Sequence, residues 1–103
     1  MSEFISVTIM TASHGEAEKI GRVLVEEKLA ACATIVANAR SIYRWKDKIE
    51  ESDEYLVIAK TLTVKFDALQ RRVSDIHSYE CPCIIATPIA MGNEVYLKWL
   101  KVN

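Results

Sequence analysis

The chain has 103 residues and a mass of 11.6 kDa, which suffices for one hydrophobic core and excludes a second. Half of the residues are hydrophobic and 26% are charged, a balance typical of a globular domain and not of a disordered chain. The formal net charge of -1 argues against nucleic acid and anionic membranes as partners, and no apolar run approaches the roughly 20 residues of a membrane span.

The N-terminal residues lack the basic and apolar regions of a signal peptide, so we expect a cytoplasmic protein. Three cysteines, an odd number, do not make a disulfide framework in such a compartment. The three glycines are too widely spaced to form a glycine-rich phosphate loop. These observations exclude secreted disulfide scaffolds and nucleotide-binding loops of that kind.

Alternation of apolar and polar residues predicts a first strand over residues 4–10, with Met10 at its end. Ser13 and Glu16 form the pattern of a capping box, which predicts a helix running to about Leu29. Residues 31–61 then predict two long strands, with a bulge or bend near Asn38 and a polar turn at residues 46–48.

Apolar residues at helical spacing predict a second helix over residues 64–77, capped by Thr61 or Thr63. A loop stiffened by Pro82 follows, and then a fourth strand over residues 84–91 that contains Pro88. Proline lacks a backbone donor, so this strand is expected at a sheet edge. Asn93 is expected to cap a short final helix.

The order of these elements predicts a single α+β domain over residues 1–103 with the ferredoxin-like βαββαβ fold and an extra C-terminal helix. Its sheet order of fourth, first, third and second strands places Pro88 at an edge. The hairpin arms of roughly fifteen residues would span about 50 Å, more than the roughly 33 Å diameter of a globule of this length. We therefore expect the hairpin to overhang the domain and to be buried in a cyclic oligomer, or else to fold back at Asn38.

Cys81 and Cys83 flank Pro82, and in extended backbone their sulfur atoms would point to one side. With His77 nearby they could bind a soft metal ion, and the thioether of Met10 would complete a cuprous site if the first strand ends beside this loop. The alternatives are structural: two small core residues for the cysteines, a core methionine, and a cationic His77 at a helix end.

Lys60 interrupts an apolar strand, where it either extends its charge to water or binds an anion with Tyr79 or Glu80 nearby. Trp45 lies among basic residues, as in proteins that stack single-stranded RNA, but the acidic segment 50–54 would repel phosphate. Neither a Gly-x-Ser-x-Gly nor a His-Glu-x-x-His motif occurs, so the sequence does not support an enzyme.

Longer motifs resemble the CutA divalent-cation tolerance family. Residues 25–32 (VEEKLAAC) and 41–51 (SIYRWKDKIEE) are similar to two characteristic elements of that family. Further matching positions are Lys60, Thr61, Phe66, Leu69, His77, Tyr79, Glu80, Pro82, Pro88 and the segment 96–100 (YLKWL). The resemblance covers almost the whole chain.

The resemblance implies a tight homotrimer in which the long hairpins of neighbouring subunits pair, and a link to tolerance of copper and other divalent cations, without an organic cofactor. His77 carries over as a metal candidate. Some members have a copper-binding cysteine where this chain has Met10, and Cys81 and Cys83 replace other residues of the family pattern. Further positions imply a pocket near subunit contacts: Cys32, Trp45, Lys60, Tyr79 and Glu80. The alternatives are a sensor of small molecules similar to PII signalling proteins, and a trimeric anchoring protein.

Overall fold

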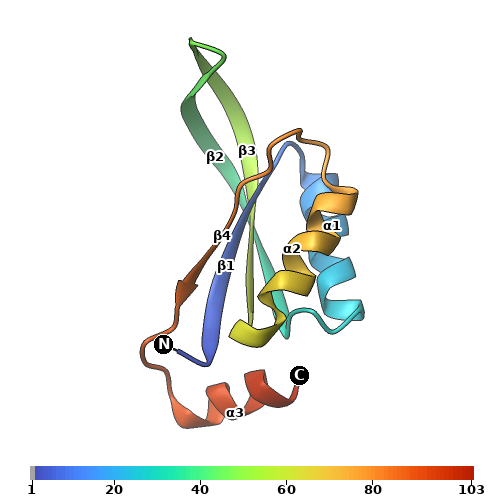
Figure 1. Cartoon of the computed structure of the whole chain (residues 1–103), viewed down its shortest axis with the longest axis vertical. Coiled ribbons are helices and arrows are strands. Elements are labelled where there is room, and N and C mark those ends of the chain that lie inside the picture. Colours follow the sequence, from blue (N-terminus) through green and yellow to red (C-terminus); the bar gives the residue numbers. More distant parts are fainter. Residues whose placement is uncertain (1) are drawn as a thin grey trace.

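The computed structural model describes residues 2–103 and contains the predicted α+β domain (Figure 1). The elements are β1 (Phe4–Thr11), α1 (His14–Glu26), β2 (Cys32–Trp45), β3 (Lys48–Leu62), the 3-10 helix η1 (Thr63–Lys65), α2 (Phe66–Ile76), β4 (Ile84–Pro88) and α3 (Glu94–Val102). The four strands form one antiparallel sheet in the order β2-β3-β1-β4, which confirms the predicted topology.

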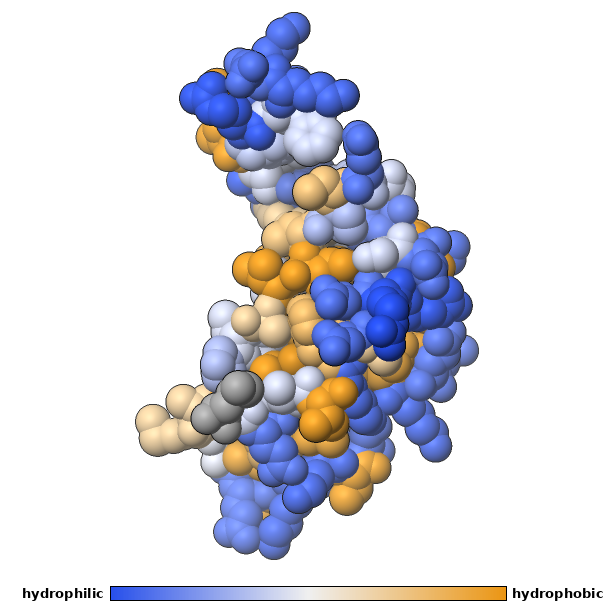
Figure 2. All heavy atoms as spheres, viewed as in Figure 1, coloured by the Kyte–Doolittle hydropathy of each residue, from blue (hydrophilic) through white to orange (hydrophobic). Residues whose placement is uncertain are grey.

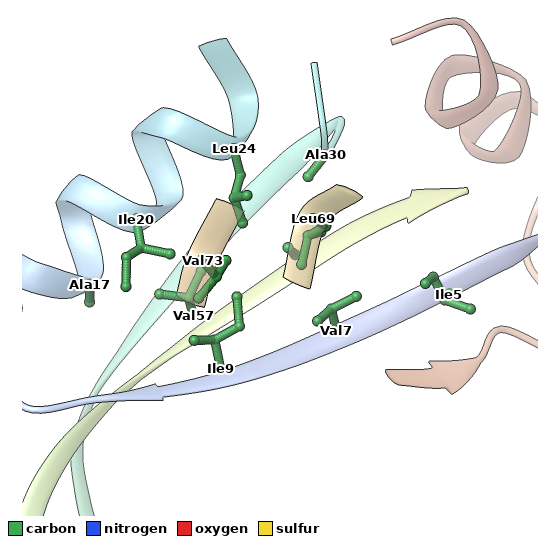
Figure 3. Packing of buried hydrophobic residues seen from close by; sticks show 11 residues of the cluster. Ile5, Val7, Ile9, Ala17, Ile20, Leu24, Ala30, Val57, Leu69 and Val73 are labelled. Atoms are coloured by element: carbon green, nitrogen blue, oxygen red, sulfur yellow. The ribbon is translucent and has the colours of Figure 1, made fainter. Parts of the chain in front are cut away.

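The hydrophobic core lies between one face of this sheet and the two helices α1 and α2 (Figure 3). Every second residue of β1 faces this layer, because side chains alternate along a strand. The fully buried apolar side chains of this layer come from β1, β3, α1 and α2: Val7, Ile9, Ala17, Ile20, Leu24, Val57, Ala59, Leu69 and Val73. The opposite face of the sheet is left to α3 at one end and to solvent elsewhere (Figure 1).

The first helix begins as predicted, since the Ser13 side chain accepts a hydrogen bond from the backbone N–H of Glu16. It ends at Glu26, three residues before the predicted boundary, because Lys28 adopts a left-handed backbone angle φ of 60°. Asn93 caps α3 through the N–H of Tyr96 at 2.8 Å, also as predicted.

The predicted caps of the second helix were wrong. Thr61 donates its hydroxyl to the carbonyl of Leu29, and Thr63 donates to the carbonyl of Ser2, so both tie distant segments together. The 3-10 helix η1 precedes α2 and supplies its first turn in place of a side-chain cap. The fourth strand is also shorter than predicted, because its pairing with β1 ends at Pro88.

The long hairpin has arms of 14 and 15 residues, and it overhangs the domain as predicted (Figure 1). β1 pairs with β3 only as far as Tyr55, so residues 39–54 form a two-stranded segment, here called the ribbon. It ends in the turn of Lys46 and Asp47, which both have positive φ. The molecule consequently measures 45 × 25 × 24 Å.

A bulge separates the ribbon from the body of the hairpin. Val36 pairs with Leu56 and Ala39 pairs with Glu54, so Ala37 and Asn38 together oppose Tyr55. Asn38 has a φ of 63°, which confirms the irregularity predicted there. The two arms stay paired beyond it, from Ala39 and Glu54 to Trp45 and Lys48, so the hairpin does not fold back on itself. Because one residue is inserted, the side chains that follow in β2 exchange faces relative to those before it.

Candidate functional site

A cavity of about 760 Å³ lies where the ribbon leaves the sheet. The ribbon forms one wall, and the segment between α2 and β4 forms the other. The lining residues are Met10, Ser41, Ile42, Tyr43, Arg44, Trp45, Glu54, Ser78, Tyr79, Glu80, Cys81 and Cys83. Of the predicted site residues the cavity therefore brings together Met10, both loop cysteines, Trp45, Tyr79 and Glu80.

Glu54 is a buried acid at the base of the ribbon, with 6% of its surface exposed. Its carboxylate accepts a hydrogen bond of 2.7 Å from the hydroxyl of Tyr79. Burial and this neighbouring carboxylate raise the pKa of Tyr79 above its ordinary value, so the hydroxyl remains a donor at neutral pH. The bond joins the loop after α2 to the ribbon and so connects the two walls of the cavity.

His77 follows α2 directly, and its side chain is completely buried. The ring nitrogen Nδ1 accepts a hydrogen bond of 3.0 Å from the backbone N–H of Tyr79. Nε2 lies 2.7 Å from the carbonyl oxygen of Met10, to which it donates, because Nδ1 is the acceptor of the neutral ring. His77 therefore ties the loop to the end of β1, in place of the cation at a helix end that was one of the expectations for it.

Glu16 supports the same loop from α1. Its carboxylate accepts hydrogen bonds from the backbone N–H groups of Ala12, at 3.0 Å, and Ser78, at 2.7 Å. Burial acts to raise the pKa of Glu16, but these hydrogen bonds from Ala12 and Ser78 hold it below its ordinary value. Glu16 thus serves both the start of α1 and the cavity wall, whereas its sequence position indicated a capping role only.

Three sulfur-bearing residues, Met10, Cys81 and Cys83, line the cavity near the end of β1. Ile9 pairs with Ile84, and the N–H of Met10 donates to the carbonyl of Cys83 at 3.2 Å, so Met10 and Cys83 stand directly opposite each other. The Cβ atoms of such a pair are about 4.5–5.5 Å apart and point to one face. Cys81 lines the same cavity.

The two loop thiols are exposed, and all three cysteines are free. Partial burial, the charge of Glu54 and the neighbouring Cys81 raise the pKa of the Cys83 thiol above its ordinary value. Within residues 2–103, no three His, Cys, Asp or Glu side chains are grouped so that they could hold a metal ion. Any metal bound here needs the thioether of Met10 or a ligand from outside the chain.

Cys32 and Lys60 lie away from this cavity. They pair with each other at the end of the sheet where β2 begins, and Lys60 also pairs with Ser6. Lys60 is six positions from Glu54 along β3, about 20 Å at strand rise, so it does not lie beside Tyr79, which Glu54 binds. The sulfur of Cys32 is 3.5 Å from the hydroxyl of Tyr96, and this contact raises the pKa of Tyr96 to about 12.

Sequence reasoning missed Glu54 as a site residue, because it belongs to a segment that reads as a solvated acidic tip. The available signal was the bulge near Asn38. Even-numbered residues of β3, including Glu54, face away from the helices. Glu54 pairs with Ala39 of β2 beyond the bulge, so Ser41, Tyr43 and Trp45 lie on the same face of the ribbon as Glu54.

Several large apolar side chains remain exposed. Ile42 and Ile49 in the ribbon are 67% and 61% exposed, and Ile85 in β4 is 56% exposed. Figure 2 shows hydrophobic residues gathered below the polar tip of the ribbon, over the strands of the domain. Within residues 2–103, no helix is long and apolar enough to cross a membrane.

Residues 5–103 match the model of the family described as CutA1 divalent ion tolerance protein. The chain is 45% identical over 103 residues to the "Divalent-cation tolerance protein CutA" of Thermus thermophilus, covering 100% of this chain and 98% of that protein. It is 46% identical over 84 residues to the "Protein CutA homolog" of Xenopus laevis, where it spans 82% of this chain but only 56% of the relative.

A solved structure of the divalent cation tolerance protein from Thermus thermophilus superimposes with a TM-score of 0.95 at 45% identity, covering 97% of both chains. Relatives differ in the location that their names state. One from Arabidopsis thaliana is called chloroplastic, and one from Archaeoglobus fulgidus is called periplasmic.

Proposed function

Because this chain belongs to the family of CutA1 divalent ion tolerance proteins, we propose that it acts as a homotrimer that binds a soft metal ion, copper above all, in the cavity beside the ribbon. The observation that carries the proposal is that Met10, Cys81 and Cys83 line one cavity, with the backbones of Met10 and Cys83 joined by a hydrogen bond. His77 borders this group through the carbonyl of Met10. The cytoplasm is the proposed location.

The donor set determines which metals fit. Thiolate and thioether ligands favour cuprous copper, and thiolates also suit zinc, whereas magnesium and calcium require oxygen ligands. Cys81 and Cys83 are exposed, so an ion can reach them without unfolding the domain. Their thiols lose a proton on binding, so affinity should rise with pH.

Copper titration of the purified protein tests this proposal. The wild type should bind about one ion per chain, and Cys81→Ser/Cys83→Ser should lose that binding. Cys32→Ser is the matched control, since it removes a thiol at the other end of the sheet and should bind as the wild type does. Equal affinity of the wild type and the double variant would refute a metal site in the cavity.

The proposal of a trimer follows from the ribbon. A two-stranded ribbon is marginally stable in water by itself, and Ile42 and Ile49 would remain exposed on an isolated subunit. β2 and β4 are open sheet edges, which subunits arranged in a ring can pair with one another. Packing of the ribbons against neighbouring copies would bury these apolar side chains and cover the open sheet edges.

Sedimentation equilibrium should therefore give about three times the subunit mass of 11.6 kDa. Trp45→Ala should weaken assembly by about 2 kcal/mol or more, because a large aromatic side chain at a subunit contact is a typical hot spot. Val64→Ala, which truncates an exposed side chain outside the ribbon, is the control. A stable monomer at micromolar concentration would contradict the trimer.

The size of the cavity favours one further candidate, a small-molecule sensor. At about 760 Å³ it has the volume of ligand sites, and Tyr43, Arg44 and Glu54 supply polar groups among apolar ones. Ligand-induced stabilisation of the Cys81→Ser/Cys83→Ser variant, which lacks the proposed metal site, would support this function. Absence of stabilisation across a panel of anionic and nucleotide ligands would argue against it.

A further inference from the structure

The buried imidazole next to the cavity is already engaged on both sides. Nδ1 of His77 accepts from the N–H of Tyr79, and Nε2 bonds to the carbonyl of Met10. A metal bond at either nitrogen would break one of these hydrogen bonds and leave a buried backbone group without its partner, which is unfavourable. The side chain is also fully buried, which leaves a metal ion no approach.

Three sulfur atoms remain as donors. Met10 and Cys83 stand opposite each other on neighbouring strands, and Cys81 lines the same cavity two residues away. They belong to one loop and one strand end, which His77 and Glu16 hold together through hydrogen bonds to Met10 and Ser78. The sulfur group therefore rests on a fixed backbone.

This donor set is poor for a divalent ion. A structural zinc site needs four ligands, and within residues 2–103 no third His, Cys, Asp or Glu joins the two thiols. The carboxylate of Glu54 is engaged by Tyr79. Monovalent copper, in contrast, is selected by soft thiolate and thioether ligands such as these.

We propose that the cavity holds an all-sulfur site, formed by Met10, Cys81 and Cys83, that selects cuprous over divalent ions, and that His77 is a positioning residue and not a ligand. The inference rests on the proposed function, because it specifies the ion and ligands of the same site. It implies that this member of a divalent-ion tolerance family handles copper in its reduced, monovalent form.

The test measures binding of cuprous copper, silver(I) and zinc to the intact protein without oxygen, by competition with chelators. The wild type should bind both monovalent ions at least about a hundredfold more tightly than zinc, and Met10→Leu should lose about tenfold in cuprous affinity alone. His77→Gln keeps an amide donor for the carbonyl of Met10, so it should lose less cuprous affinity than His77→Ala, which removes both hydrogen bonds of the ring. X-ray absorption at the copper edge should detect sulfur neighbours without imidazole.

Each alternative result has a distinct meaning. An imidazole signal, or loss of cuprous affinity in His77→Gln equal to that in Cys81→Ser/Cys83→Ser, would overturn the positioning role of His77. Zinc affinity within tenfold of cuprous affinity would overturn the selectivity while leaving a metal site in place. Absence of thiol-dependent binding of any of the three ions would overturn both this inference and the proposed metal-binding function.

Discussion

The hydrogen bond between Tyr79 and Glu54 should be one of the larger single contributions to stability around the cavity. Tyr79→Phe removes the donor hydroxyl and leaves the ring in place. Glu54 is then a carboxylate with 6% of its surface exposed and without the bond of 2.7 Å. Hydrogen bonds to charged groups contribute about 1.5–3 kcal/mol, so we expect the free energy of unfolding to fall by about 2 kcal/mol.

Urea unfolding at one fixed protein concentration measures this change, because assembly would make the stability depend on concentration. Tyr55→Phe is the matched control, a half-buried tyrosine outside this hydrogen bond, and should change the stability by less than about 0.5 kcal/mol. In a Glu54→Gln background the loss on Tyr79→Phe should be roughly halved, because neutral hydrogen bonds are about half as strong as charged ones.

A loss in Tyr79→Phe no greater than in Tyr55→Phe would refute the reasoning, since it would mean that Glu54 is not stabilised by this donor. An unchanged loss in the Glu54→Gln background would equally show that the effect comes from the tyrosine ring environment and not from the charged pair.

Three further predictions concern pH, packing and partners. The pKa of Glu16 is lowered in the folded state, so its contribution to stability is present above the ordinary pKa of 4.5 and is lost as the pH falls through the lower pKa of the folded protein. The difference in unfolding free energy between the wild type and Glu16→Gln should therefore shrink on acidification below pH 4.5. Gly21→Ala should destabilise by about 1 kcal/mol, because the new Cβ would lie 3.2 Å from Cβ of Ala33, whereas Gly15→Ala meets nothing within 4 Å and should not. Gel-shift assays at about 200 mM salt should detect no RNA or DNA complex, and a surviving micromolar complex would contradict the charge argument.

The alternation of apolar and polar residues predicted the strands of the sheet, because each strand buries the side chains of one face only. The alternation in residues 4–10, the position of Pro88 and the irregularity at Asn38 each have a local cause that the sequence displays. The boundaries of the helices were less predictable. Lys28 ends α1 through a backbone angle that no residue type enforces, and Thr61 and Thr63 donate to partners 32 and 61 residues away.

The candidate site was predictable in its residue types and not in its contacts. The sequence indicated that Cys81 and Cys83 point to one side, but only the register of β1 and β4 places Met10 opposite Cys83. His77 was weighed as a ligand or a helix-end cation, and its two hydrogen bonds depend on backbone groups that sequence patterns do not locate. The sequence also suggested that Lys60 lies near Tyr79. The two are apart because Tyr79 binds Glu54, at the base of the ribbon, and Lys60 lies further along β3.

The bulge at Ala37 and Asn38 limits how the hairpin can change in evolution. Deleting one of these residues would restore regular pairing and rotate every later side chain of β2 by half a turn, which would move Tyr43 and Trp45 to the face of the ribbon opposite Glu54. Deleting or inserting one residue in each arm near the tip would change the length of the ribbon. The side chains nearer the bulge would keep their faces, because the two arms would stay in register. Related chains should therefore vary in hairpin length by even numbers while retaining the phase shift at its base.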